Sequence, residues 1–236
     1  NVLKTFNDIV RECDFIHVTT PLLKDKLIQD TNALPSKIYC FNNALCMNQE
    51  YIDKRGEFDK DKITFGFQGG STHYIDLHEI KDVINEILNK YKNSIFLYCS
   101  TPSQFDLFKT FSERRINIPP THSFDEFRSI PSYFDIGLAP LQYNEFNKYK
   151  SYLKILEYSV FKRPIIVTNW GDYKNYKELN QDGVEAIDNS PSNWYNKISE
   201  LIEDQEKRLS IGNNAYNFLF GERSLDSINL KRLEFY

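Results

Sequence analysis

The stretch FDIGLAPLQYNEFNKYKSYLKILEYSVFKRPIIVTN, residues 134–169, holds two apolar runs separated by a segment with helical spacing. The runs 134–141 and 164–169 are almost continuously apolar, which is typical of strands that are buried on both faces of a sheet. Between them, the spacing predicts a helix whose apolar face is formed by Leu153, Leu156 and Val160. The stretch therefore predicts a strand–helix–strand unit with parallel strands.

The same alternation continues along the chain from residue 63. Apolar runs predict strands, and amphipathic or capped segments predict the helices between them. We expect strands at 63–70, 94–100, 116–120, 134–141, 164–169 and 183–188. We expect further helices at 76–91, 104–114, 123–133, where Ser123 and Glu126 would form a capping box, and within 192–222. The pattern predicts an α/β fold with a doubly wound, Rossmann-like parallel sheet.

The first 62 residues are expected to form a separate part. A charged segment, 48–62, is poor in apolar residues and is interpreted as a linker or a surface excursion. Before it we expect a helix at 2–12, a strand at 14–20, a helix at 22–31 and a strand at 37–45. Because the chain opens without methionine and in helix-like sequence, we expect it to be a piece of a longer protein.

Composition argues against several classes of function. The net charge is -4, so the chain lacks the basic excess with which a general nucleic-acid binder neutralises phosphates. No apolar run approaches the length of a membrane span, which predicts a soluble protein. The cysteines show no metal-ligand spacing and are expected to be reduced thiols in the cytoplasm; they are Cys13, Cys40, Cys46 and Cys99.

In an open α/β sheet, ligands bind beyond the carboxyl ends of the strands, near helix N-termini. A glycine loop, GFQGGSTHYID at 66–76, is predicted to lie there, and its glycines would let backbone N–H groups approach an anion. It lacks both the GxGxxG fingerprint and the GK[ST] of a P-loop. The alternative is a tight turn with a capped helix and a surface histidine. The candidate residues are Gly69, Gly70, Ser71, Thr72 and His73.

A second segment, IPPTHSFD at 118–125, follows the expected strand at 116–120. A nucleobase or another ring could lie against its backbone, close to His122. A loop stiffened by two prolines before a capped helix is the alternative interpretation, and the residues alone leave both open.

The lysines of the opening stretch form the third candidate site. On a helix that starts near Tyr149, Lys150, Lys154 and Glu157 would lie within about 60° of one another. A solvated face with a Lys–Glu pair is one interpretation. It leaves the lysines at the positive end of the helix dipole, where cations are unfavourable. A bound anion such as a diphosphate would resolve that conflict, with Glu157 accepting hydrogen bonds from hydroxyl groups one turn deeper.

Other signatures of chemistry do not lead to a site. The DKD sequence at 59–61 has the spacing with which a DxD motif holds a metal on a nucleotide sugar. It lies in the charged segment rather than after a buried strand, so no metal site is assigned to it. The chain also has no GxSxG and no HExxH sequence.

The stretch FDIGLAPLQYNEFNKYKSYLKILEYSVFKRPIIVTNWGDY resembles the donor-binding signature of GT-B glycosyltransferases of group 1, the family 4-like type. A pattern DIGLAPL…FN..KS..K.LEY…G.PVI.S recurs in that group. ITFGFQGGSTHYID resembles the first strand and glycine loop of the same C-terminal domain, and DFIHVTTPLLKDKL with KIYCFNNAL looks like the end of the N-terminal domain. The resemblance implies four parts: the end of an N-terminal acceptor domain at 1–47, a linker at 48–62, a nucleotide-sugar-binding Rossmann-like domain at 63–220 and a C-terminal tail at 221–236.

The resemblance also implies an activity. Such a bacterial enzyme would be a retaining, metal-independent hexosyltransferase of polysaccharide biosynthesis, without a cofactor. It would move a sugar from a nucleotide-diphosphate sugar to a glycan, lipid-linked or protein acceptor. The expected location is the cytoplasm, including the inner face of the membrane by peripheral association, and the expected partner is the rest of the N-terminal domain.

By the same resemblance, Lys150 and Lys154 would neutralise the diphosphate, an electrostatic role, and Glu157 would hold the ribose hydroxyls. Ser151 would supply a further hydrogen bond. The loop from Gly69 to Ser71 would face the diphosphate or the sugar. The remaining donor-binding candidates are Thr72, His73, Asn147 and, near the base, Thr121 and His122.

Three departures from the family pattern leave alternatives open. Tyr149 stands where many relatives have the first glutamate of E-x7-E, and Glu145 is out of register. The usual Arg–xxxx–Lys after the glycine loop is absent, and Lys162–Arg163 replaces a small-residue–Gly turn. A GT-B nucleotide-sugar epimerase and a degenerate nucleotide-binding or interaction domain are therefore the alternatives. In every case we expect this chain alone to lack transferase activity, because the acceptor side is missing.

Overall fold

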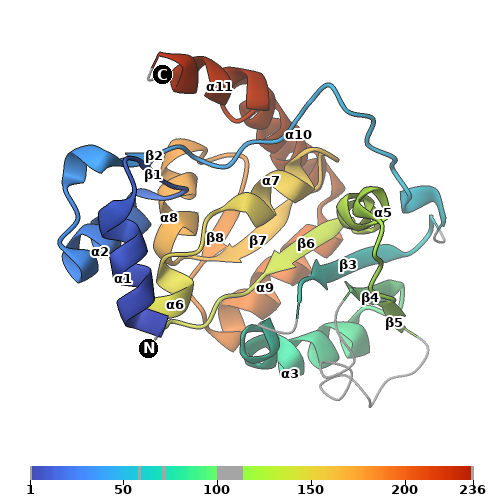
Figure 1. The fold of residues 1–236 in the computed structure, drawn as a ribbon. Helices are drawn as coiled ribbons and strands as arrows, with labels where there is room; N and C mark the ends of the chain where they lie inside the picture. The colour runs from blue at the N-terminus through green and yellow to red at the C-terminus, as the bar shows by residue number, and fades with distance from the viewer. Residues whose placement is uncertain (1, 58–59, 71–72, 100–113, 235–236) are drawn as a thin grey trace.

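A six-stranded parallel sheet organises the larger part of the chain (Figure 1). The computed structural model describes residues 2–57, 60–70, 73–99 and 114–234. The strand order is β5–β4–β3–β6–β7–β8. The strands are β3 (Ile63–Gln68), β4 (Ser94–Cys99), β5 (Arg115–Ile118), β6 (Ile136–Ala139), β7 (Ile165–Thr168) and β8 (Glu185–Ile187). This order confirms the doubly wound α/β fold predicted from the alternation of strands and helices.

Helices alternate with these strands along the chain. Between β3 and β6 the structure has α3 (Tyr74–Lys90), α5 (Phe124–Ser129) and the 3-10 helix η5 (Ile130–Tyr133). The helices that follow are α6 (Glu145–Lys148), α7 (Leu153–Ser159), α8 (Gly171–Leu179), α9 (Pro191–Glu203), α10 (Gln205–Glu222) and α11 (Leu225–Leu233). The sequence pattern does not predict α8 or α11, and the helix expected at 104–114 lies outside the described residues except for Arg114. Within the described parts of the chain, no helix is both long and apolar enough to cross a membrane.

The strands bury apolar side chains on both faces of the sheet, as continuous apolar runs require. Because side chains alternate along a strand, each face receives every second residue. On one face, Phe65, Phe67 and Ile166 belong to a core that α3 and α9 cover. On the other face, Leu97 and Val167 belong to a second core that includes side chains of α7, α8 and α10.

Two glycines bring the central strands close to a pair of aromatic rings. Gly66 of β3 and Gly137 of β6 lie opposite each other in the sheet. A Cβ atom at Gly66 would lie 2.4 Å from the Phe134 ring, and one at Gly137 would lie 2.3 Å from the Tyr158 ring. The two rings stack at 5.7 Å between centroids over this bare part of the sheet. The glycines therefore position α7, which carries Tyr158, against the centre of the sheet.

The N-terminal residues form a small unit of their own. It consists of α1 (Val2–Glu12), β1 (Ile16–Val18), α2 (Pro21–Thr31), η1 (Pro35–Lys37) and β2 (Ile38–Cys40), and the two strands pair in parallel. Val10, Val18, Leu27, Ala33 and Ile38 form its core. Figure 1 shows the chain leaving β2, crossing the view above α7 and descending at the right to the start of β3. On this path Leu45 forms a β-bridge with Ser224, just before α11.

Two arginines fasten the connecting segment to the large sheet. Arg55, in the 3-10 helix η2 (Arg55–Glu57), donates from Nε and Nη2 to the two carboxylate oxygens of Asp135, each at 2.8 Å. Arg163 donates to both oxygens of Asp53, at 3.0 and 2.8 Å. A bidentate pair such as Arg55–Asp135 fixes the relative orientation of the two side chains in addition to its electrostatic attraction. The part of 48–62 that carries Asp53 and Arg55 is therefore held against the sheet.

Asp172 is a buried acid in the first turn of α8, and its side chain is only 2% exposed. Burial raises the pKa of this carboxyl from 3.8 to about 6, although a side-chain hydrogen bond from Asn175, the backbone N–H of Tyr152 and the charge of Arg223 act in the opposite direction. Its Oδ2 atom has no hydrogen-bond partner among the described residues. The ionised form of Asp172 is therefore poorly satisfied in the folded chain.

We expect the stability of the fold to fall between pH 4 and pH 6 because of Asp172. In this range the unfolded carboxyl loses its proton while the folded one keeps it, so raising the pH favours the unfolded state. At about 1.4 kcal/mol per pKa unit, the loss above pH 6 is on the order of 3 kcal/mol. Urea unfolding of Asp172→Asn should show a stability advantage over the wild type that grows from pH 4 to pH 6 and then levels off. The exposed Asp182→Asn is the control; an advantage independent of pH would contradict the explanation.

Gly137→Ala should destabilise the fold, because its methyl group would enter the space of the Tyr158 ring. Overpacking of this kind costs about 1–3 kcal/mol. The measurement is the free energy of unfolding in urea. Gly56→Ala is the control, since a Cβ atom there meets nothing within 4 Å. Equal stabilities for the two variants would show that the ring moves aside without cost.

Candidate functional site

The candidate site lies at the point where the order of the sheet reverses. β3 and β6 are neighbours, but the chain continues from β3 toward β4 and from β6 toward β7, on opposite sides. In doubly wound sheets this switch point opens a crevice beyond the carboxyl ends of the strands. The glycine loop follows β3, and residues 140–151 follow β6. Two of the three predicted segments therefore meet at this crevice.

The glycine loop is a close-packed turn. The backbone N–H of Gly69 donates to the carbonyl of Cys99 at 3.0 Å, and the N–H of His73 donates to the carbonyl of Gly70 at 3.1 Å. A Cβ atom at Gly69 would lie 2.4 Å from the ring of Phe67, whereas one at Gly70 would meet nothing within 4 Å. A residue with a side chain would therefore overlap the Phe67 ring at position 69. The candidates Ser71 and Thr72 lie outside the described residues.

The single helix predicted from Tyr149 is wrong. α6 ends at Lys148 and α7 begins at Leu153, so Lys150 lies between two helices rather than one turn before Lys154. Lys148 is in the last turn of α6, where the helix dipole favours a cation. Of these lysines only Lys154 occupies a first turn, and the dipole conflict that motivated the anion site is smaller than the sequence implies.

A close backbone contact shapes the break between the two helices. Gly171 has a φ of 55°, and a Cβ atom there would lie 2.4 Å from the carbonyl oxygen of Lys148. Tyr152 is buried, and its hydroxyl accepts a hydrogen bond from Nε of Arg223 at 2.7 Å. The chain between Lys148 and Tyr152 is therefore packed against the start of α8, and an uninterrupted helix would not make these contacts. We call residues 147–151 the lysine loop.

Both lysines of the site face carboxylates. Nζ of Lys150 lies 3.5 Å from Oδ2 of Asp76, and Nζ of Lys154 lies 3.1 Å from Oε2 of Glu157. Burial lowers the pKa of Lys150, and the Asp76 carboxylate offsets this only in part. The site thus holds its cations in place with acids, and the four charges balance.

Asp76 is the residue that the sequence analysis missed. It lies in the first turn of α3, is 2% exposed, and contacts the glycine loop and the segment after β6. Burial by itself would raise its pKa, but hydrogen bonds from His73 and from the backbone N–H of Gln142, with the charge of Lys150, outweigh burial and lower the pKa. In an amphipathic helix a single acid looks like a solvated position, so only its partners in space identify it.

Three buried polar atoms around the crevice have no hydrogen-bond partner among the described residues. They are Oε1 of Gln68 at the end of β3, Nζ of Lys150 and Oε2 of Glu157, although the last two lie in the ion pairs with Asp76 at 3.5 Å and with Lys154 at 3.1 Å. An unsatisfied buried polar group costs about 1–3 kcal/mol, and native proteins contain few of them. Their position around one crevice is consistent with a polar ligand that would satisfy them.

The other predicted residues of the lysine loop have partners. The Asn147 side chain is buried and donates to Asp76 at 2.7 Å. The Ser151 hydroxyl accepts from Nδ2 of Asn43 at 2.6 Å, which connects the loop with the chain that follows β2. The hydroxyl of Tyr149 donates to Oε2 of Glu145 at 3.0 Å. A carboxylate therefore stands beside Tyr149, although the register places it one turn earlier than expected.

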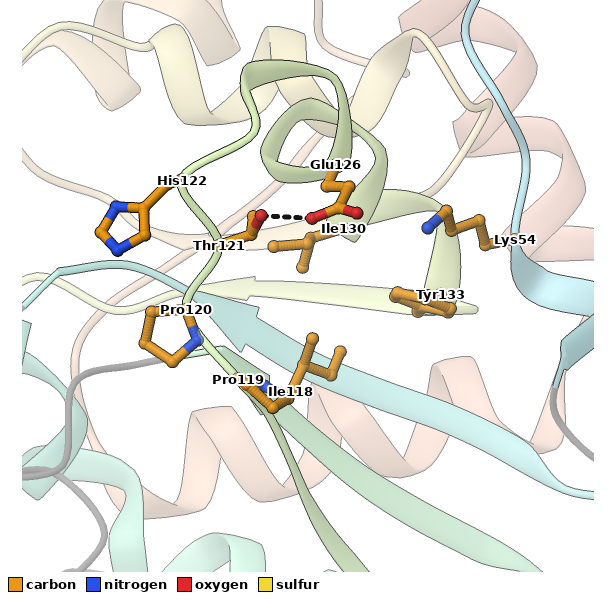
Figure 2. Close-up of a pocket in the computed structure, with 9 residues that line it drawn as sticks. All are labelled: Lys54, Ile118, Pro119, Pro120, Thr121, His122, Glu126, Ile130 and Tyr133. Atoms are coloured by element: carbon orange, nitrogen blue, oxygen red, sulfur yellow. Dashed lines mark hydrogen bonds between the residues drawn. The ribbon is translucent and has the colours of Figure 1, made fainter.

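Thr121 and His122 line a separate hollow of about 470 Å³ (Figure 2). Ser123 caps α5 as predicted, but the capping box is not reciprocal, because the Glu126 carboxylate accepts from the hydroxyl of Thr121 instead of from the N–H of Ser123. Figure 2 shows the His122 ring pointing away from the Thr121–Glu126 pair.

Glu157 lines a second hollow, of about 310 Å³, whose lining is mostly apolar. Phe124, Phe127 and Arg128 of α5 and Leu153 of α7 also line it. Leu153, expected in the core, therefore faces this hollow. Val160 also lines it but is only 9% exposed, and Leu156 is fully buried as predicted. The structure thus brings His73, Asn147, Lys150, Lys154 and Glu157 to one region and leaves His122 in another hollow.

Among the described residues, no group of three or more His, Cys, Asp or Glu side chains is arranged to hold a metal ion. Asp61 is described, but Asp59 of the discounted DKD sequence is not.

This fold is similar to that of the C-terminal domain of GT-B glycosyltransferases of group 1. HepE from Anabaena, in complex with UDP and glucose, superposes with a TM-score of 0.79 at 12% identity, over 99% of this chain and 66% of HepE. A TarM variant from S. aureus, in complex with Fondaparinux, alpha-GlcNAc-glycerol and UDP, gives 0.74 at 13% identity, over 98% of this chain and 46% of TarM.

The C-terminal domain of LpcC, a group 1 glycosyl transferase from Francisella tularensis, superposes with a TM-score of 0.60 at 18% identity, over 75% of this chain and 95% of that domain. The chain thus corresponds to that domain with additional residues, and spans just under two thirds of HepE. No family model matches the chain, and no curated protein matches it in sequence.

Proposed function

We propose that this chain is the donor-binding part of a retaining, metal-independent glycosyltransferase. The enzyme would transfer a sugar from a nucleotide-diphosphate sugar to a glycan, lipid-linked or protein acceptor. The observation that carries the proposal is the meeting of Lys150, Lys154 and Glu157 with the glycine loop at the switch point of the sheet. The complex of HepE with UDP and glucose, on the same fold, supports a nucleotide sugar as the ligand.

The lysines provide the charge that a diphosphate requires. The Lys150 ammonium carries three donors, and its Nζ makes no hydrogen bond among the described residues, so it has donors to offer a phosphate. Lys154 is 3.1 Å from Glu157 and can exchange part of this contact for phosphate oxygens. The N-terminus of the 17-residue helix α3, which follows the glycine loop, adds a helix dipole of the favourable sign.

The nucleoside would extend from the lysines toward α5. Glu157 pairs with Lys154 at 3.1 Å through Oε2, and once Lys154 turned toward the diphosphate its carboxylate could accept hydrogen bonds from the hydroxyls of a ribose. The hollow that it lines is apolar and contains Phe124, with the Arg128 guanidinium 5.7 Å from the Phe124 ring centroid. Such a surface fits a planar base. We therefore propose the base in this hollow or at the backbone near Thr121 and His122, beside the same helix.

In this function the protein stabilises the leaving group. When the bond between the anomeric carbon and the phosphate oxygen breaks, negative charge grows on the nucleoside diphosphate. Lys150 and Lys154 would stabilise that charge from fixed positions, which lowers the barrier without a metal ion. The sugar itself would lie near Tyr149 and Glu145, whose hydrogen-bonded pair would take the place of the family's first glutamate.

The Tyr149 position also favours a second candidate. If Tyr149 cannot hold the sugar, the domain would bind a nucleotide without supporting transfer, as a degenerate binding or interaction domain. Sugar transfer by a protein that contains this chain together with an acceptor domain would exclude that candidate. Hydrolysis or epimerisation of the donor without transfer would indicate the epimerase alternative.

Titration of the chain with UDP, GDP and dTDP in a calorimeter tests the proposal. We expect one of the three to bind, and Lys154→Ala to weaken that binding about 10- to 100-fold, because a hydrogen bond to a charged group contributes about 1.5–3 kcal/mol. Lys174→Ala, which removes an exposed lysine of α8, is the control and should leave the affinity unchanged. Absence of binding for all three nucleotides would refute the proposed function.

A further inference from the structure

Asp76 joins the two loops that border the crevice. Its Oδ1 accepts from the backbone N–H of Gln142 at 2.8 Å and from Nδ2 of Asn147 at 2.7 Å. Its Oδ2 lies 2.9 Å from Nδ1 of His73 and 3.5 Å from Nζ of Lys150. One buried carboxylate thus contacts the glycine loop on one side and three residues after β6 on the other.

The contacts of Asp76 divide between its two oxygens in a way that only a carboxylate can satisfy. An ionised carboxylate has acceptors on both oxygens. The N–H of Gln142 and the amide of Asn147 donate to Oδ1. Oδ2 faces the Lys150 ammonium at 3.5 Å and Nδ1 of His73, which is a donor in the Nδ1–H tautomer. Asparagine has the same shape but replaces one oxygen with a donor. If its oxygen stays with Gln142 and Asn147, its NH₂ group faces His73 and Lys150, where it meets the Lys150 ammonium and requires the lone pair of Nδ1.

The partners of Asp76 are residues that the proposed function uses. Lys150 is the cation proposed for the diphosphate, and it belongs to the lysine loop. The backbone of this loop turns at Asn147, where the N–H of Lys150 donates to the Asn147 carbonyl at 3.2 Å. Asn147 is itself held by Asp76 and by the Gln142 carbonyl at 3.0 Å. His73 packs edge-on against Phe67, with 5.5 Å between ring centroids. Holding Asp76 in place therefore holds a cation and an imidazole at fixed positions.

We propose that Asp76 is a positioning residue that fixes Lys150, Asn147 and the Nδ1–H tautomer of His73 around the crevice. The consequence for ligand binding rests on the proposed function; the arrangement itself does not. Asp76 touches no part of the donor in this scheme. It acts through Lys150, which it orients, and through His73, whose Nε2 is left with a lone pair that can accept a hydrogen bond.

The binding test compares UDP with UMP, which lacks the second phosphate. Asp76→Asn should raise the Kd for UDP about tenfold or more, and that for UMP about threefold at most, because a misplaced Lys150 matters more to the more highly charged ligand. Asp82→Asn, which makes the same charge change at an exposed position of α3, should change neither. Equal losses for UDP and UMP would overturn the action through Lys150.

A double-mutant cycle tests the path of the effect. In a Lys150→Met background, Asp76→Asn should change the Kd for UDP less than about twofold, because the residue through which it acts is gone. Effects that multiply independently in the double variant would overturn the proposal. Thermal unfolding of each variant separates a loss of folding from a loss of positioning, and Asp76→Glu should recover part of the UDP affinity because it restores acceptors on both oxygens.

A measurement without ligand tests the arrangement directly. The ¹⁵N shifts of the His73 ring at a pH where it is neutral should report the Nδ1–H tautomer in the wild type and the Nε2–H tautomer in Asp76→Asn. The same tautomer in both would overturn the proposal. If UDP, UMP, GDP and dTDP all fail to bind the wild type, the proposed function falls, and the tautomer alone decides whether Asp76 positions these groups.

Discussion

The pairing of β3 with β6 is the contact on which the rest of the structure depends. The chain leaves these two strands in opposite directions: β4 and β5 lie beyond β3, and β7 and β8 lie beyond β6. Gly66 and Gly137 lie opposite each other at this pairing and leave the sheet without side chains on one face. Tyr158 fills that space and brings α7 with it. The position of Lys154 and Glu157, which project from the same helix, follows from the two missing side chains.

The sheet could be predicted because its inner strands β4, β6 and β7 are nearly continuous apolar runs that are buried on both faces. The limits of α3 and the cap of α5 were predictable for a similar reason, since their signals are local. α8 was not, because its buried residues include Asp172, Tyr173 and Tyr176, which do not form an apolar stripe. Its place is set by contacts with β7, β8 and the lysine loop, and these depend on the fold.

The site divides in the same way. The sequence pointed to Lys150, Lys154 and Glu157 as a group of charges after β6, and Nζ of Lys150 does lie 3.5 Å from Oδ2 of Asp76, in the helix that follows the glycine loop. Their role as ligand contacts stays a prediction. Their actual arrangement was not predictable, because the expected helix is interrupted by a contact with Gly171 that is distant in sequence. Asp76 could not be identified from the sequence for a related reason. Its four partners come from two segments, and an acid in the first turn of a helix has an ordinary explanation in the helix dipole.

Position 171 bears on how this domain could be re-engineered. The lysine loop packs against Gly171, which has no side chain and adopts a left-handed backbone conformation. A designer who varies residues 147–151 is therefore free to change outward-facing groups, but not to shift the loop toward α8. The specificity that variants of this loop can reach would be limited by Gly171, a residue that is not proposed to contact a ligand.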